Sequence, residues 1–127
     1  MRHGRVVIAD DSPDIRLLLR LAIHSDPELE LVGEAADGAE AVSLAQALQP
    51  DLMLLDLSMP VMDGLEAIPL IRGVAPGTAI IVVSGFLTGE TKQHVIDAGA
   101  VGYVEKGGDF HELIAYVRKV HLEHFGS

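Results

Sequence analysis

The run Leu52-Met53-Leu54-Leu55 ends at Asp56, so that a fully apolar segment is followed directly by an acid. Two other apolar runs end in a similar way, one at the acid pair Asp10-Asp11 and one close to Lys106. When parallel strands end at one edge of a sheet, the side chains that follow them meet there. Three carboxylates at one edge repel one another and raise each other's pKa. We therefore expect a cation to share this site.

Five short aliphatic segments alternate with five segments of helical periodicity. This alternation is typical of βαβ units, and the continuous apolar run Ile80-Ile81-Val82-Val83 indicates a strand covered on both faces. We predict an α/β fold, a doubly wound five-stranded parallel sheet in the flavodoxin-like order 2-1-3-4-5, with five helices on both faces and a ligand crevice between strands 1 and 3. The expected strands are 5–10, 30–35, 51–56, 79–84 and 101–104, and the expected helices are 13–25, 38–48, 64–73, 88–98 and 110–123.

The predicted helix starts carry recognisable capping residues. Ser12-Pro13 combines an N-cap with a proline at the first helical position, where the missing N–H costs nothing. Asp37, Asp63 and Asp109 each precede a glutamate by three residues, which is the pattern of a capping box. Pro69 lies inside the third predicted helix and removes one backbone hydrogen bond, so we expect a kink or an early end there.

The composition excludes several classes of protein. A chain of 127 residues with 49% hydrophobic residues can form one domain with a sizeable core, and the absence of cysteine excludes disulfides and thiolate metal sites. The net charge of −10 disfavours binding to nucleic acid or to an anionic membrane surface, and favours divalent cations and basic protein surfaces. No segment approaches the roughly 20 apolar residues of a membrane span, and no signal peptide is recognisable. We expect a cytoplasmic protein.

The chemistry of the charged strand ends points to phosphoryl transfer. Carboxylate oxygens at one edge suit a hard cation such as Mg²⁺, which would also hold phosphate oxygens. Ser84, at the end of the fourth strand, and Lys106, just past the fifth, are placed to donate to the remaining phosphoryl oxygens. A carboxylate nucleophile with these neighbours predicts an aspartyl-phosphate site.

At this point the chain resembles a response-regulator receiver domain over essentially its whole length. The matching residues are Asp10-Asp11, Asp56-Leu57-Ser58-Met59-Pro60, Met62-Asp63-Gly64, Ser84-Gly85, Tyr103 and Lys106. The resemblance implies a two-component signalling domain, not an enzyme with a separate substrate, whose Asp56 is phosphorylated by a sensor histidine kinase or a phosphotransfer protein. It also implies that Asp11 and Asp56 bind Mg²⁺ directly, that Asp10 acts through water, and that the backbone carbonyl of Ser58 is a further ligand.

The resemblance assigns the remaining site residues as well. Ser84 and Lys106 would hold the phosphoryl oxygens, and Tyr103 would be an aromatic switch that turns inward when Ser84 moves. The chain departs from the family in one place, because receivers typically follow the lysine with a proline after a cis peptide bond, whereas Gly107 and Gly108 follow it here. A cis bond costs about 2.5–4 kcal/mol before a non-proline residue but under about 1 kcal/mol before proline. Either the bond is trans and the loop is rearranged, or strain is stored at the site.

The domain organisation follows from the same resemblance. We expect residues 1–127 to form a single receiver domain, with no output domain in this chain. The segments Leu31-Val32-Gly33-Glu34-Ala35 and Asp37-Gly38 are similar to receivers that precede a helix-turn-helix domain. An output domain or a phosphorylation-dependent homodimer is therefore a possible partner, through a surface on the fourth helix, fifth strand and fifth helix.

Two alternatives remain open at this stage. One is an interaction module with the same fold that works without phosphorylation, for which the Lys106-Gly107 departure is the sequence support. The other is a haloacid-dehalogenase-like phosphatase, but such enzymes place a second Asp where this chain has Ser58. His121 and His124, three apart on a predicted helix, are expected to be solvated surface residues rather than a metal pair.

Overall fold

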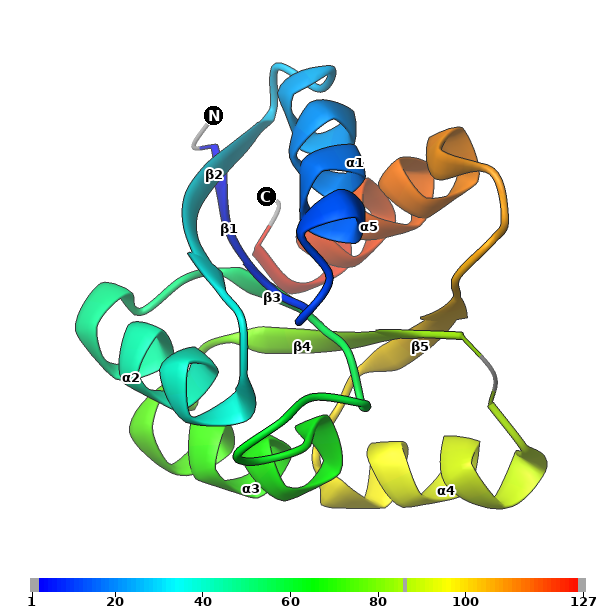
Figure 1. The fold of residues 1–127 in the computed structure, drawn as a ribbon. Helices are drawn as coiled ribbons and strands as arrows, with labels where there is room; N and C mark the ends of the chain where they lie inside the picture. The colour runs from blue at the N-terminus through cyan, green and yellow to red at the C-terminus, as the bar shows by residue number, and fades with distance from the viewer. Residues whose placement is uncertain (1–2, 86, 126–127) are drawn as a thin grey trace.

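The computed structural model describes residues 3–85 and 87–125 of the chain. Five parallel strands form one sheet in the order β2-β1-β3-β4-β5, which confirms the predicted topology (Figure 1). The strands are β1 (Gly4–Ala9), β2 (Leu29–Ala35), β3 (Leu52–Leu55), β4 (Ala79–Ser84) and β5 (Gly102–Glu105). The helices are α1 (Pro13–His24), α2 (Gly38–Leu48), α3 (Gly64–Val74), α4 (Gly89–Ala98) and α5 (Phe110–Phe125). Among the described residues, no helix has the length and the apolar character that crossing a membrane requires.

The helices cover the sheet on both faces, with α1 and α5 on one face and α2, α3 and α4 on the other (Figure 1). Because successive side chains of a strand point to opposite faces, each inner strand contributes to two cores. In β1, Val6 and Ile8 pack with the residues of α1 and α5, whereas Val7 and Ala9 pack with those of α2 and α3. This double burial explains why the inner strands lack polar alternation.

The helix starts agree with the capping residues in the sequence. Ser12 Oγ accepts a hydrogen bond from the Ile15 N–H at 3.3 Å, and Asp37 and Asp63 each accept one at 2.8 Å from the N–H three residues later. Asp109 instead accepts at 2.8 Å from the His111 N–H, two residues later. The early helix end that we considered at Pro69 is wrong, because α3 continues to Val74.

His121 contradicts the prediction of a solvated surface histidine. Its side chain is 3% exposed and belongs to the buried stripe of α5 that includes Val117 and Val120. Its ring stacks on Phe125, with 5.8 Å between the centroids. Within the part of the chain that the structure describes, neither ring nitrogen has a hydrogen-bond partner. His124, by contrast, is exposed as expected.

We expect His121→Leu to stabilise the fold. A buried polar atom without a partner costs about 1–3 kcal/mol, and leucine fills a similar volume without polar atoms. The free energy of unfolding, measured by urea denaturation at neutral pH, should rise by about 1–2 kcal/mol. The control His124→Leu, at an exposed position on the same helix, should change it by less than about 0.5 kcal/mol. A destabilised His121→Leu protein would contradict the assignment of unpaired ring nitrogens.

Candidate functional site

The pairing of β1 with β3 places two acids side by side. Ala9 is the register partner of Leu55, so that the next residues, Asp10 and Asp56, leave adjacent strands at the same edge. The Asp56 N–H donates to the Ala9 carbonyl at 2.9 Å, which extends the ladder by one residue. The two acids therefore leave neighbouring inner strands at the same, carboxyl end of the sheet.

The loop after β3 is held close to Asp56 by a glycine. The Gly64 N–H donates to the Leu57 carbonyl at 2.9 Å, and a Cβ atom at position 64 would collide with the backbone of Asp56 and Leu57. Only glycine allows α3 to begin this close to the strand end. The sequence Asp63-Gly64 thus combines a helix cap with the close packing that fixes the Asp56 backbone.

Asp10, Asp11 and Asp56 form one cluster, in which each residue offers a carboxylate oxygen within 4.8 Å of the others. Asp10 is 1% and Asp56 is 4% exposed, whereas Asp11 is open to solvent. Asp10 is oriented by the Ser12 N–H, which donates to Asp10 Oδ1 at 2.9 Å. We call this cluster of two buried acids and one exposed acid the acidic crevice, and we refer to the exposed Asp11 as the acid at its mouth.

Lys106 is the cation of this crevice. Its Nζ lies 2.6 Å from Asp10 Oδ2 and 3.1 Å from Asp56 Oδ2, although two glycines follow it. The Lys106 N–H donates to the Ser84 carbonyl at 2.7 Å, which ties its backbone to the end of β4. One lysine thus bridges both buried acids.

The conformation of the loop after Lys106 shows whether the peptide bond before Gly107 is cis or trans. The described residues contain no cis peptide bond, so the bond before Gly107 is trans, and the outcome with a strained cis bond is wrong. Gly107 has φ = 90°, in the left-handed region that residues with a side chain rarely adopt. The loop turns through a left-handed glycine, and Lys106 still reaches the acids.

The electrostatics of the crevice reflect its burial. Burial raises the pKa of Asp56; the hydrogen bond from Lys106 opposes this change and the charge of Asp10 adds to it. Burial alone would lower the pKa of Lys106, but its hydrogen bonds to Asp10 and Asp56 outweigh that effect and raise it. Lys106 therefore stays charged, and ionisation of Asp56 in the folded protein costs free energy.

A pH-dependent stability follows from the raised pKa of Asp56. Because the folded state binds this proton more tightly than the unfolded state, stability falls as the pH rises from the ordinary range of an aspartate through the raised pKa. In buffer without divalent cations, Asp56→Asn should be more stable than the wild type at neutral pH. The difference should disappear in acid, where Asp56 is protonated. Urea denaturation of both proteins between pH 4 and pH 8 measures it, and a constant difference across that range would contradict this account.

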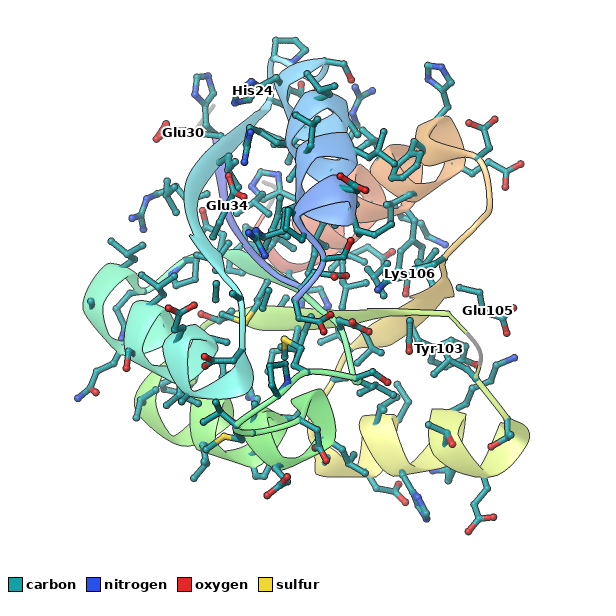
Figure 2. All side chains as sticks on the ribbon, in the orientation of Figure 1. His24, Glu30, Glu34, Tyr103, Glu105 and Lys106 are labelled. Atoms are coloured by element: carbon teal, nitrogen blue, oxygen red, sulfur yellow. The ribbon has the colours of Figure 1, made fainter. Side chains whose placement is uncertain are left out.

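The remaining predicted residues lie around the crevice. Ser84 is 6% exposed at the end of β4, and the exposed Ser58 donates its N–H to Asp56 Oδ1 at 3.4 Å. Tyr103 is 36% exposed and lies on the side of β5 that faces α4, while Lys106 lies beyond the end of the same strand (Figure 2). The structure thus brings Lys106 into contact with Asp10 and Asp56, places Asp11 beside these two acids, and leaves Tyr103 turned outward.

Two basic residues near the site were missed in the sequence. Arg16 donates from Nη1 to the Asp10 carbonyl at 2.7 Å, and nothing in the sequence marked it. Lys92 lies over the Tyr103 ring, 5.3 Å from its centroid. A weak signal for Lys92 was present, because a cation near the N-terminus of a helix is slightly unfavourable electrostatically.

The donor set of the crevice fits a divalent cation. It consists of carboxylate oxygens, the ligands preferred by Mg²⁺ and Ca²⁺. Lys106 contacts two of the three acids, and burial raises the pKa of Asp56. A divalent cation would balance the remaining negative charge, with Asp11 accessible from solvent.

Comparison with known proteins places the chain in a family. Residues 6–118 match the family described as the response regulator receiver domain. The chain belongs to this family. The receiver domain resembles the response regulator domain of Thermotoga maritima CheB, with a TM-score of 0.88, 31% identity and coverage of 99% of this chain and 98% of that chain. It also resembles a LuxR-family two-component response regulator from Aurantimonas sp. SI85-9A1, with a TM-score of 0.90, 30% identity and coverage of 96% and 87%.

Curated relatives of the receiver domain are longer proteins. The transcriptional regulatory protein LiaR of Bacillus subtilis is 38% identical over 90% of this chain and 54% of its own length. Protein-glutamate methylesterase/protein-glutamine glutaminase 1 of Methanosarcina acetivorans is 35% identical over 92% of this chain and 36% of its own length. The receiver domain thus spans about a third to a half of these relatives.

Proposed function

We propose that this receiver domain is a phosphorylation-controlled switch, in which Asp56 accepts a phosphoryl group from a sensor histidine kinase or a phosphotransfer protein. The observation that carries the proposal is the contact of Lys106 Nζ with Asp10 and Asp56 inside a three-carboxylate crevice. The family match supports the same class of function. We place the reaction in the cytoplasm.

The metal of this reaction is proposed to be Mg²⁺, held by Asp11 and Asp56, by Asp10 through water and by the Ser58 carbonyl. When bound, it neutralises charge on the phosphoryl oxygens. Asp56 is the nucleophile, because Asp10 already accepts the shorter lysine contact and Asp11 lies at the mouth. Its oxygen forms a bond to phosphorus while the bond from phosphorus to the histidine nitrogen breaks, and the electron pair of that bond stays on the nitrogen.

Lys106 and Ser84 are proposed to bind the transferred group. The ammonium group of Lys106 is charged, since its pKa is raised, and it already contacts Asp56. Ser84 ends β4, two strands from β1 in the sheet, so its hydroxyl would approach from the side opposite Asp10. Both groups can donate to phosphoryl oxygens.

The added charge is proposed to change the surface of α4, β5 and α5. A group bound by Ser84 and Lys106 favours one of two conformations of the loops that carry them, and Tyr103 turns inward in that conformation. The partner is an output domain, a target protein or a second copy of the domain. The transcriptional regulator LiaR and the glutamate methylesterase both extend beyond the part that matches this chain, which supports an output domain as the main class of partner.

Incubation with Mg²⁺ and a small phosphodonor tests the proposal. We expect the intact mass to increase by one phosphoryl group, with the modification on the peptide that contains Asp56, and no increase when the metal is chelated. An unmodified protein under conditions in which Mg²⁺ binding has been measured would overturn the proposal.

The alternatives have lost support. Lys106 contacts both buried acids although glycines follow it, which weakens the sequence argument for a phosphorylation-independent module. The phosphatase alternative fits poorly with the family match and with Ser58 in place of a second acid. If beryllofluoride, a phosphoryl mimic, bound without any change in the Tyr103 environment, the phosphorylation-independent module would be favoured again.

A further inference from the structure

Lys92 occupies a place between two side chains of β5. Its Nζ lies 5.3 Å from the centroid of the Tyr103 ring and 4.0 Å from Glu105 Oε1. Tyr103 and Glu105 are two residues apart on the strand, so both point to the face that α4 covers. In Figure 2 both residues lie at the end of the sheet that β5 forms. The Lys92 ammonium group therefore lies near both the Tyr103 ring and the Glu105 carboxylate.

The position of Lys92 in α4 is unfavourable without these contacts. It lies in the first turn of the helix, where its own N–H donates to the Thr88 carbonyl at 2.9 Å. The first turn has a partial positive charge and favours acids such as Glu90. The attraction of a cation to an aromatic face and to a carboxylate offsets this cost.

The turn of α4 that carries Lys92 lies shortly after Ser84 in the sequence. Ser84 is the last residue of β4, and α4 begins at Gly89. Ser84 is also tied to β5, since its carbonyl accepts from the Lys106 N–H at 2.7 Å. Ser84 is therefore close in sequence to the turn that carries Lys92, and it is hydrogen-bonded to the residue that follows the strand of Tyr103.

We propose that Lys92 is a positioning residue that holds Tyr103 in its outward, resting orientation. The inference rests on the proposed function, because it concerns the same switch. The contact between the Tyr103 ring and the Lys92 ammonium group must break before the ring can turn inward. Removing the cation therefore shifts the conformational equilibrium toward the inward state without touching the acidic crevice.

Lys92→Met removes the charge and keeps an unbranched side chain of similar length. If the inward state binds beryllofluoride with Mg²⁺ more tightly, the apparent dissociation constant should fall by about two- to fivefold, the range of an exposed cation–π contact. Lys92→Arg keeps the cation and should behave like the wild type. The matched control is Lys119→Met, at an exposed lysine of α5, which should leave the affinity unchanged. In the Tyr103→Leu background, Lys92→Met should have a clearly smaller effect.

A second measurement needs no ligand. The ring-proton chemical shifts of Tyr103 should change in Lys92→Met and stay constant in Lys119→Met in the metal-free protein. Equal affinities and equal ring shifts for the two variants would overturn the role of Lys92. A wild type that binds Mg²⁺ but not beryllofluoride would instead overturn the proposed function. The ligand-free ring shifts distinguish the two failures, because they do not depend on phosphorylation.

Discussion

Asp56→Asn is expected to incorporate no phosphoryl group from a small phosphodonor in the presence of Mg²⁺. The amide has neither the charge nor the nucleophilic oxygen of the carboxylate, and Asp10 cannot replace it because Asp10 holds the shorter contact to Lys106, at 2.6 Å. Intact-mass measurement should show no incorporation above that of a metal-free control. Since burial makes the Asp56 carboxylate costly, the variant should remain at least as stable as the wild type, so its inactivity would not reflect unfolding.

Variants of two other acids test whether the effect is specific to the nucleophile. Asp97→Asn, on the exposed side of α4, should be phosphorylated like the wild type, and its Oδ1 can still accept the hydrogen bond from Gln93. Asp11→Asn keeps Asp56 but loses the acid at the mouth of the crevice, so it should require more Mg²⁺ and recover when the Mg²⁺ concentration is raised. Phosphorylation of Asp56→Asn on another acid of the cluster would show that the nucleophile was misassigned.

Lys106→Met should have the second large effect, on both reactivity and stability. The loss of one preorganised hydrogen-bond donor can slow a reaction by about 10²–10³-fold, and phosphorylation should slow by a similar factor. Asp10 and Asp56 would be left without their cation, which should lower the free energy of unfolding at neutral pH by about 1–3 kcal/mol. The difference in the free energy of unfolding between Lys106→Met and the wild type should shrink as the pH falls and Asp56 becomes protonated. Phosphorylation time courses and urea denaturation measure the two effects.

Lys119→Met again serves as the control, because it removes the same charge from an exposed position of α5. It should change stability by less than about 0.5 kcal/mol. If both lysine variants slowed phosphorylation equally, the effect would come from net charge, and the contact of Lys106 with the acids would not explain it. Wild-type rates in Lys106→Met would mean that the glycine-rich loop leaves the lysine outside the reaction.

Much of the site could be predicted from local patterns. Acids that follow apolar strands identify the carboxyl edge of a parallel sheet, and the fold rule then places Asp10 and Asp56 side by side. The caps at Asp37 and Asp63 could be read in the same way, because each depends on residues three apart. These features are encoded within a few residues, so the sequence contains all the information that they need.

Other features depend on contacts between distant segments. The loop after Lys106 required a φ value that the sequence Gly107-Gly108 permits but does not specify. The pairing of Lys92 with Tyr103 depends on how α4 packs beside β5 and on side-chain orientation. His121 is different, since the helical period of the apolar residues in α5 already placed it on the buried face. The prediction of a surface histidine followed the polarity of the imidazole, whereas the helical period correctly indicated burial.

Gly107 shows how a position can be constrained without touching anything. A Cβ atom added there would have no neighbour within 4 Å, and the residue is exposed, so by contact alone it should tolerate any substitution. Its left-handed backbone, with φ = 90°, costs a residue with a side chain about 1–2 kcal/mol. A larger residue would relieve that cost by turning the chain, and the adjacent Lys106 would move with it. Mutational tolerance at this surface position therefore reports on the geometry of the acidic crevice, whose atoms it never contacts.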